Sequence, residues 1–92
     1  MIDAETWLRK KLKDPKFKAE YDRLEPEFAL AREVISARVK AKLSQAQVAK
    51  RMGTSQSAVA RIESGRSPSL TSLRRYAKAV GSKLEIRLKK AG

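Results

Sequence analysis

The side chains that could do chemistry in this 92-residue chain are amides, hydroxyls and cationic groups. The sequence has no His and no Cys, so the usual general base, the commonest metal ligand and a thiol nucleophile are all missing. A catalytic carboxylate pair is not indicated either, because Glu33, Glu63 and Glu85 are scattered. We therefore expect no enzyme activity, no metal and no cofactor, and a function that depends on binding.

Residues 44–63, SQAQVAKRMGTSQSAVARIE, combine such groups with the pattern of two short amphipathic helices. Ser44 and Ser55 each stand where a hydroxyl accepts an amide proton of the first helical turn. Between them, Gly53 can adopt the left-handed backbone that ends one helix and turns the chain. The outward faces carry Gln, Ser, Lys and Arg. This predicts a helix-turn-helix, although helix pairs of this kind are common in helical proteins. The inward apolar residues are Val48, Ala49, Met52, Val59 and Ile62.

Positive charge is concentrated in the second part of the chain. Residues 1–28 hold seven basic and seven acidic side chains, whereas residues 29–92 hold fifteen basic and three acidic ones, so the net charge of +12 lies after residue 28. Lys and Arg that neutralise phosphates release condensed counterions, which makes DNA the leading partner. A basic surface that only keeps the protein in solution is the alternative.

The remaining sequence predicts further helices around this motif. Asp3, Asp14 and Ser69 are candidate N-caps. Pro15 and Pro26 suit the first turns of two separate helices, so we expect a break just before Pro26. The predicted additional helices cover residues 4–13, 15–24, 26–42 and 70–80.

The last segment changes to the period of a strand. In residues 83–89, Leu84, Ile86 and Leu88 alternate with charged residues, which indicates a half-buried strand. No second strand is apparent in the sequence, and a lone strand needs a partner for its backbone groups. We expect this strand to help tie a homodimer, with a frayed tail as the alternative.

Two charged residues fall on apolar helix faces. Arg38 lies four residues after Val34, and Glu63 lies four after Val59. A buried charge without a partner is costly, so we expect a structural ion pair between Arg38 and Glu63. In the alternative, both side chains reach solvent past their neighbours.

Residues 1–28 predict a helical arm that has no net charge but carries apolar side chains at helical spacing. Either the chain's own long helix or a protein partner covers these side chains. The acidic stretch 20–28 suits a basic protein, whereas residues 7–18 would also fit a membrane-surface helix interrupted at Asp14 and Pro15. No stretch approaches the roughly 18 apolar residues of a membrane span, and we expect a cytoplasmic protein without membrane contact. The candidate partner contacts are Trp7, Phe17, Tyr21, Leu24 and Phe28.

Residues 29–81, with LSQAQVAKRMG, TSQSAVARIESG and PSLTSLRRYAKAVG, resemble the Xre or phage-repressor type of helix-turn-helix domain. The resemblance implies an all-α fold, a compact bundle of about five helices with a lambda-repressor-like helix-turn-helix. The bundle is flanked by a short helical arm at residues 1–28 and by one C-terminal β-strand within residues 82–92. The resemblance also implies binding to double-stranded operator DNA as a homodimer and a buried ion pair at Arg38 and Glu63. The residues at family spacing are Gln45, Ala49, Gly53, Val59, Ile62, Glu63 and Gly65.

The flanks, DPKFKAEYDRLEPEFALAREVISARVKAKLSQ and GSKLEIRLKK, are similar to HigA-type antitoxins of toxin–antitoxin pairs. This similarity implies an autorepressor of its own operon that also neutralises a RelE/HigB-like, mRNA-cleaving toxin. The arm is then the candidate toxin-binding and dimer region. A stand-alone Xre-family repressor without a toxin is the alternative, and a basic adaptor that uses the fold only for protein contacts is the third hypothesis.

The resemblance also assigns DNA contacts, because the family places the start of the motif's second helix in the major groove. Gln56 is the first choice for base reading, since its amide can bond adenine with two hydrogen bonds. Arg61 suits either guanine or a phosphate. The candidate base contacts are Gln56, Ser57, Ala60 and Arg61. The candidate phosphate contacts are Gln45, Thr54, Ser64, Arg66 and Ser69.

Overall fold

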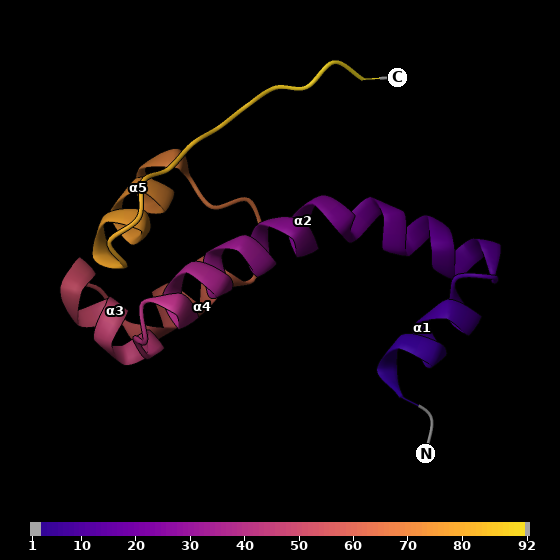
Figure 1. Cartoon of the computed structure of the whole chain (residues 1–92), viewed down its shortest axis with the longest axis horizontal. Helices are drawn as coiled ribbons and strands as arrows, with labels where there is room; N and C mark the ends of the chain where they lie inside the picture. The colour runs from indigo at the N-terminus through magenta and orange to yellow at the C-terminus, as the bar shows by residue number, and fades with distance from the viewer. Residues whose placement is uncertain (1–2, 92) are drawn as a thin grey trace.

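The computed structural model describes residues 3–91, and these residues form five α-helices joined by short connections (Figure 1). The all-α class expected from the sequence is confirmed for this part of the chain. The helices are α1 (Ala4–Lys11), α2 (Pro15–Lys40), α3 (Gln45–Met52), α4 (Gln56–Glu63) and α5 (Leu70–Ala79).

The second half of α2 packs with α3, α4 and α5 around one hydrophobic core. Val48 of α3 and Val59 of α4 are fully buried between their helices. Tyr76 of α5 extends across the core, and its hydroxyl lies 3.1 Å from the carbonyl oxygen of Val34 in α2. This packing fixes α3 and α4 relative to each other. The other buried members of the core are Ala49, Met52, Ile62, Leu73, Ala79 and Val80.

Local interactions set the ends of the two motif helices. The Ser44 hydroxyl accepts the Gln47 amide proton at 3.1 Å, and the Gln47 side chain accepts the Ser44 amide proton at 2.8 Å, which forms a capping box. Ser55 caps α4 by accepting the Ala58 amide proton at 3.1 Å. Gly53 has φ +67°, so the sharp turn uses the left-handed backbone that the sequence predicts at this position.

Gly65 brings the chain after α4 into close contact with α2. Its φ is +74°, and a Cβ at this position would overlap the backbone carbonyl of Glu27. Both the backbone conformation and the lack of space therefore exclude a side chain. The contact holds the end of α4 against the middle of α2.

The predicted break before Pro26 is wrong, because α2 runs without interruption from Pro15 to Lys40 with Pro26 inside it. Proline removes one backbone hydrogen bond, to the carbonyl of Asp22 four residues earlier. Both Asp22 and Pro26 are exposed, so water can hydrate that carbonyl and the helix continues. As a result the arm is joined rigidly to the bundle, and the expected boundary at residue 28 falls within a helix.

The predicted C-terminal strand is also wrong: the tail leads away from α5 as a drawn-out segment without strand pairing up to residue 91 (Figure 1). Leu84 is half-buried and packs against the core. Ile86 and Leu88 are 61% and 99% exposed. The alternating pattern thus places one side chain inward, but a strand also needs a neighbouring backbone, which this single chain does not supply.

The arm consists of α1 and the first half of α2, and it projects from the bundle (Figure 1). Its rings contact one another: Trp7 meets Phe17 edge to face at 6.0 Å between centroids, and Tyr21 lies 6.4 Å from Phe17 and 5.6 Å from Phe28. The arm therefore covers part of its own apolar surface, although Trp7 stays 48% exposed. Over residues 3–91, no helix combines the length and the apolar content that crossing a membrane requires.

Candidate nucleic-acid interface

Helix α4 buries one face and exposes the other. Val59 and Ile62 point into the core. Residues three and four apart share a helix face, so the exposed residues form one continuous strip along the outside. That strip contains all four predicted base contacts, Gln56, Ser57, Ala60 and Arg61.

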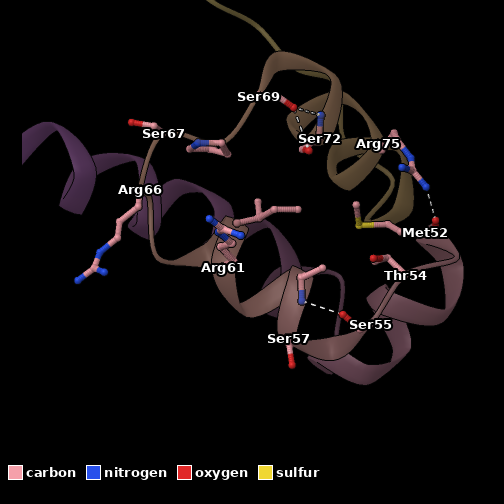
Figure 2. A pocket seen from close by; sticks show the side chains of 13 residues that line it. Met52, Thr54, Ser55, Ser57, Arg61, Arg66, Ser67, Ser69, Ser72 and Arg75 are labelled. Atoms are coloured by element: carbon pink, nitrogen blue, oxygen red, sulfur yellow. Dashed lines mark hydrogen bonds between the residues drawn. The ribbon is translucent and has the colours of Figure 1, made fainter.

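An open concavity lies beside this strip, between α4, the loop that follows it and the start of α5 (Figure 2). Ser57 and Arg61 line it from α4, and Thr54 lines it from the turn before α4. Arg66 and Ser69 line it from the loop after α4. The fold thus gathers five of the nine predicted DNA contacts around one depression.

The other four predicted contacts lie outside the concavity. Gln45 and Gln56 lie at the starts of adjacent helices, where the Gln56 amide nitrogen donates to the Gln45 amide oxygen at 3.4 Å. Ala60 lies on the exposed strip of α4. The Ser64 hydroxyl donates to the carbonyl of Arg61 at 2.6 Å and so helps to end α4.

Three polar or charged residues that the sequence interpretation did not name also line the concavity: Ser67, Ser72 and Arg75. The Ser72 amide donates to the Ser69 hydroxyl at the start of α5, and the Arg75 guanidinium donates to the carbonyl of Met52 at the end of α3 (Figure 2). Ser69, Ser72 and Arg75 are spaced three residues apart, which places Ser72 and Arg75 on one face of α5. This spacing was visible in the sequence. The return of α5 to the turn before α4 is a tertiary feature that the sequence does not reveal.

A buried hydrogen-bond network connects this interface to the core. Glu63 is 5% exposed, and its carboxylate accepts from the Arg38 guanidinium at 2.7 and 3.0 Å, so the two side chains form the ion pair expected from their spacing. The same carboxylate accepts from the Tyr76 hydroxyl at 2.7 Å and from the Gln45 amide at 3.2 Å. Since Gln45 also accepts from Gln56, a chain of side-chain contacts leads from the ion pair to the start of α4.

The network keeps its charges balanced inside the protein. Burial raises the pKa of Glu63, but hydrogen bonds from Arg38, Tyr76 and Gln45 outweigh burial and leave that pKa below its usual value. The hydrogen bond to Glu63 raises the pKa of Arg38, and burial followed by the contact with Glu63 raises the pKa of the Tyr76 phenol. At neutral pH the carboxylate is therefore ionised, the guanidinium is charged and the phenol remains a donor.

The surface around α4 is strongly cationic. Arg61, Arg66 and Arg75 line the concavity, and no Asp or Glu lines it. Glu63, which ends α4, is turned inward and neutralised by Arg38. Such a surface attracts polyanions. Along residues 3–91, no group of three or more His, Cys, Asp or Glu side chains is placed to hold a metal ion.

Helices α3 and α4 are joined by a tight turn at Gly53, and α4 exposes amide, hydroxyl and guanidinium groups on a basic face. This arrangement is typical of a DNA-binding helix-turn-helix. Comparison with known families agrees: residues 34–86 match the helix-turn-helix family, and this match covers more than half of the chain. The chain belongs to that DNA-binding family, as its resemblance to Xre-type domains predicts.

The chain is also similar to antitoxin HigA1 of Mycobacterium tuberculosis, in strain CDC 1551 / Oshkosh and in strain ATCC 25618 / H37Rv. In both comparisons the identity is 39% over 74 residues, which cover 79% of this chain and 50% of the relative. The chain thus spans about half the length of the curated relatives it matches. No solved structure gives a significant match.

Proposed function

We propose that the chain is the antitoxin of a type II toxin–antitoxin pair, a dimeric repressor of its own operon that also neutralises a RelE/HigB-like mRNA-cleaving toxin. Its membership of the helix-turn-helix family and its similarity to proteins named antitoxin HigA1 support this proposal. The observation that most directly supports DNA binding is the exposed strip of α4 beside a concavity that is lined by three arginines and no acidic residue. Residues 29–81 are then the DNA-binding domain, and residues 1–28 are the toxin-binding arm.

In the proposed complex with operator DNA, the start of α4 enters the major groove. Gln56 has two amide hydrogens and one carbonyl oxygen, and its contact with Gln45 uses one hydrogen. The second hydrogen and the oxygen remain for the N7 and N6 positions of an adenine. Ser57 and Ala60 face neighbouring bases, and Arg61 binds either a guanine or a phosphate from the side of the concavity.

The proposed phosphate contacts surround this helix and orient it without reading sequence. Thr54, Arg66 and Ser69 are at the concavity, and Gln45 is at the start of α3, where free backbone amides also favour an anion. Ser64 is the weakest member of this group, because its hydroxyl must first release the carbonyl of Arg61 before it can donate to a phosphate.

The proposed toxin contact lies on the arm, far along the chain from α4. Trp7 is 48% exposed, and Phe17, Tyr21 and Leu24 are half-buried along the same arm. Residues 20–27 add four acidic side chains and one Arg. An apolar surface next to this acidic stretch suits a basic ribonuclease partner, because charge complementarity favours encounter and orientation.

Co-expression with the product of a neighbouring reading frame tests both activities. We expect the chain to capture that product in a pull-down, to rescue growth and to bind DNA upstream of the gene. Trp7→Ala should weaken capture and leave DNA binding intact, whereas Gln56→Ala should do the reverse. Loss of both activities in both variants would contradict the division of the chain into an arm and a DNA-binding domain.

A stand-alone repressor is the second candidate function. One observation favours it: the family match begins at residue 34 and leaves the whole arm outside. In that case the chain binds operator DNA, but neither captures the neighbouring product nor rescues growth.

A further inference from the structure

The side of α2 that faces away from the core carries a long apolar stripe. Its members recur every three or four residues, which is the spacing of the seam in paired helices. Phe28, Ile35 and Val39 are 37%, 37% and 59% exposed. The stripe consists of Phe17, Tyr21, Leu24, Phe28, Ala31, Ile35 and Val39.

The second half of this stripe forms a shallow apolar groove, which we call the α2 seam. Apolar surface dominates the groove, whose charged members are Arg32 and Lys40. Ala31 and Ser36 are small enough for another helix to approach closely. The seam is composed of Phe28, Ala31, Arg32, Ile35, Ser36, Val39 and Lys40.

We propose that a second copy of this chain occupies the α2 seam, so that two α2 helices pair antiparallel in a homodimer. This inference names the surface of the homodimer that the proposed function requires, and it rests on that function. A two-fold symmetric contact is natural for one chain type, because the same patch then serves both partners.

Charge complementarity favours the antiparallel direction. Glu25 and Lys40 are about four helical turns apart, so they lie near the same flank of the seam. They are also equally far from the point between Arg32 and Glu33, where we place the two-fold axis. An antiparallel copy therefore brings its Lys40 beside Glu25. One Glu25 oxygen accepts from Arg32 of its own chain at 2.9 Å, and its other oxygen is available to the incoming ammonium.

A parallel pair would have the opposite electrostatics. It would place Lys40 beside Lys40 and Glu25 beside Glu25, and these like charges repel. Arg32 lies close to its copy in both directions, so it does not decide between them. Arg32 and Lys40 disfavour a basic toxin on the seam, whereas the acidic stretch 20–27 on the arm suits one. The occupant that the charges favour here is therefore a second antiparallel α2.

The proposed dimer leaves the DNA-binding face free. No seam residue lines the concavity beside α4, and none belongs to the exposed strip of α4. A two-fold axis through the seam would relate two α4 helices by symmetry, which is the symmetry of a palindromic operator.

Sedimentation equilibrium of the whole chain without DNA tests the surface. We expect the wild type to dimerise and Ile35→Asp to raise the dimer dissociation constant by about 100-fold, since it places a charge in a desolvated contact. Ile86→Asp, at an exposed apolar residue of the tail, is the matched control and should leave the constant unchanged. Circular dichroism verifies that both variants fold.

Three results would overturn the proposal: a monomeric wild type, an Ile35→Asp variant that dimerises like the wild type, or dissociation caused by Ile86→Asp instead. Because no DNA or toxin is present, failure of the proposed function would leave this measurement unaffected.

Disulfide trapping tests the direction of pairing, and the chain suits it because it has no cysteine of its own. In the antiparallel dimer, Arg32→Cys lies near the two-fold axis and should cross-link to its copy under mild oxidation. Two Lys40→Cys sites would lie roughly 22 Å apart along the helix axis, beyond the reach of a disulfide. Efficient cross-linking of Lys40→Cys would overturn the antiparallel arrangement, because only a parallel pair brings these two sites together.

Discussion

Replacing Arg38 with methionine removes the charge partner of Glu63 while keeping much of the side-chain volume. The Glu63 side chain is 3% exposed, and Arg38 supplies two of its four hydrogen bonds. Breaking a buried pair in this way costs about 3–5 kcal/mol, because a buried charge loses its compensation. The Arg38 side chain is 17% exposed, so water can enter, and the donors from Tyr76 and Gln45 remain. We therefore expect a loss near the lower limit, about 3 kcal/mol in the free energy of unfolding.

Urea denaturation of the two proteins measures this loss. Arg23→Met is the matched control, because its ion pair with Glu20 is exposed, with 68% and 66% of the two side chains accessible. Exposed pairs contribute up to about 1 kcal/mol, so the control should stay close to the wild type. If Arg38→Met loses no more stability than Arg23→Met, the buried pair does not have the structural role assigned to it.

The dependence on pH gives the same prediction a second readout. The pKa of Glu63 in the folded protein lies below its usual value of 4.5. Its stabilising contribution is thus complete above about pH 4.5 and is lost as the pH falls through the folded pKa. In Arg38→Met, burial is opposed by fewer hydrogen bonds, so the pKa of Glu63 is higher than in the wild type. As the pH falls, Glu63 of the variant therefore takes up a proton before Glu63 of the wild type does, and this removes its uncompensated buried charge. The difference in stability between wild type and variant should narrow from about pH 7 to about pH 4. A constant or growing difference would refute this reasoning.

Two further predictions concern the turn after α4 and the reading of DNA. Gly65→Ala should cost at least about 2 kcal/mol more than Gly81→Ala in thermal unfolding, because both sites have positive φ but only the first Cβ meets a backbone. Equal losses would show that α2 and the loop separate easily. Gln56→Ala should reduce discrimination at one base pair by about 1–3 kcal/mol, while Gln45→Ala should weaken binding to operator and random DNA alike in fluorescence anisotropy. Parallel losses for both variants on both DNAs would contradict their assigned roles.

The parts of the fold that follow from local interactions could be predicted from the sequence. Ser44 and Ser55 cap their helices through hydroxyl contacts within three residues, and Gly53 turns the chain through its own backbone freedom. Arg38 and Glu63 could be paired because helical spacing placed both charges on apolar faces. Each inference needed only neighbouring residues or a single helical period.

The parts that depend on distant or absent neighbours could not be predicted in this way. Pro26 normally begins a helix, but here its exposed position makes one missing hydrogen bond tolerable within α2. The tail around Ile86 has the alternation of a strand, yet a strand needs a second backbone. Arg75 joins the concavity only because α5 folds back on the turn after α3, which no local pattern specifies.

The central claim is that the exposed strip of α4 lies against the bases of operator DNA. A photo-crosslinking phenylalanine analogue at position 57 tests it most directly, with the same analogue at position 5 on α1, an exposed site outside the α2 seam, as the control. With DNA from upstream of the gene, we expect cross-links to bases from position 57 and none from position 5. Cross-links from position 5 alone, or none from position 57 on DNA that the protein demonstrably binds, would contradict the claim.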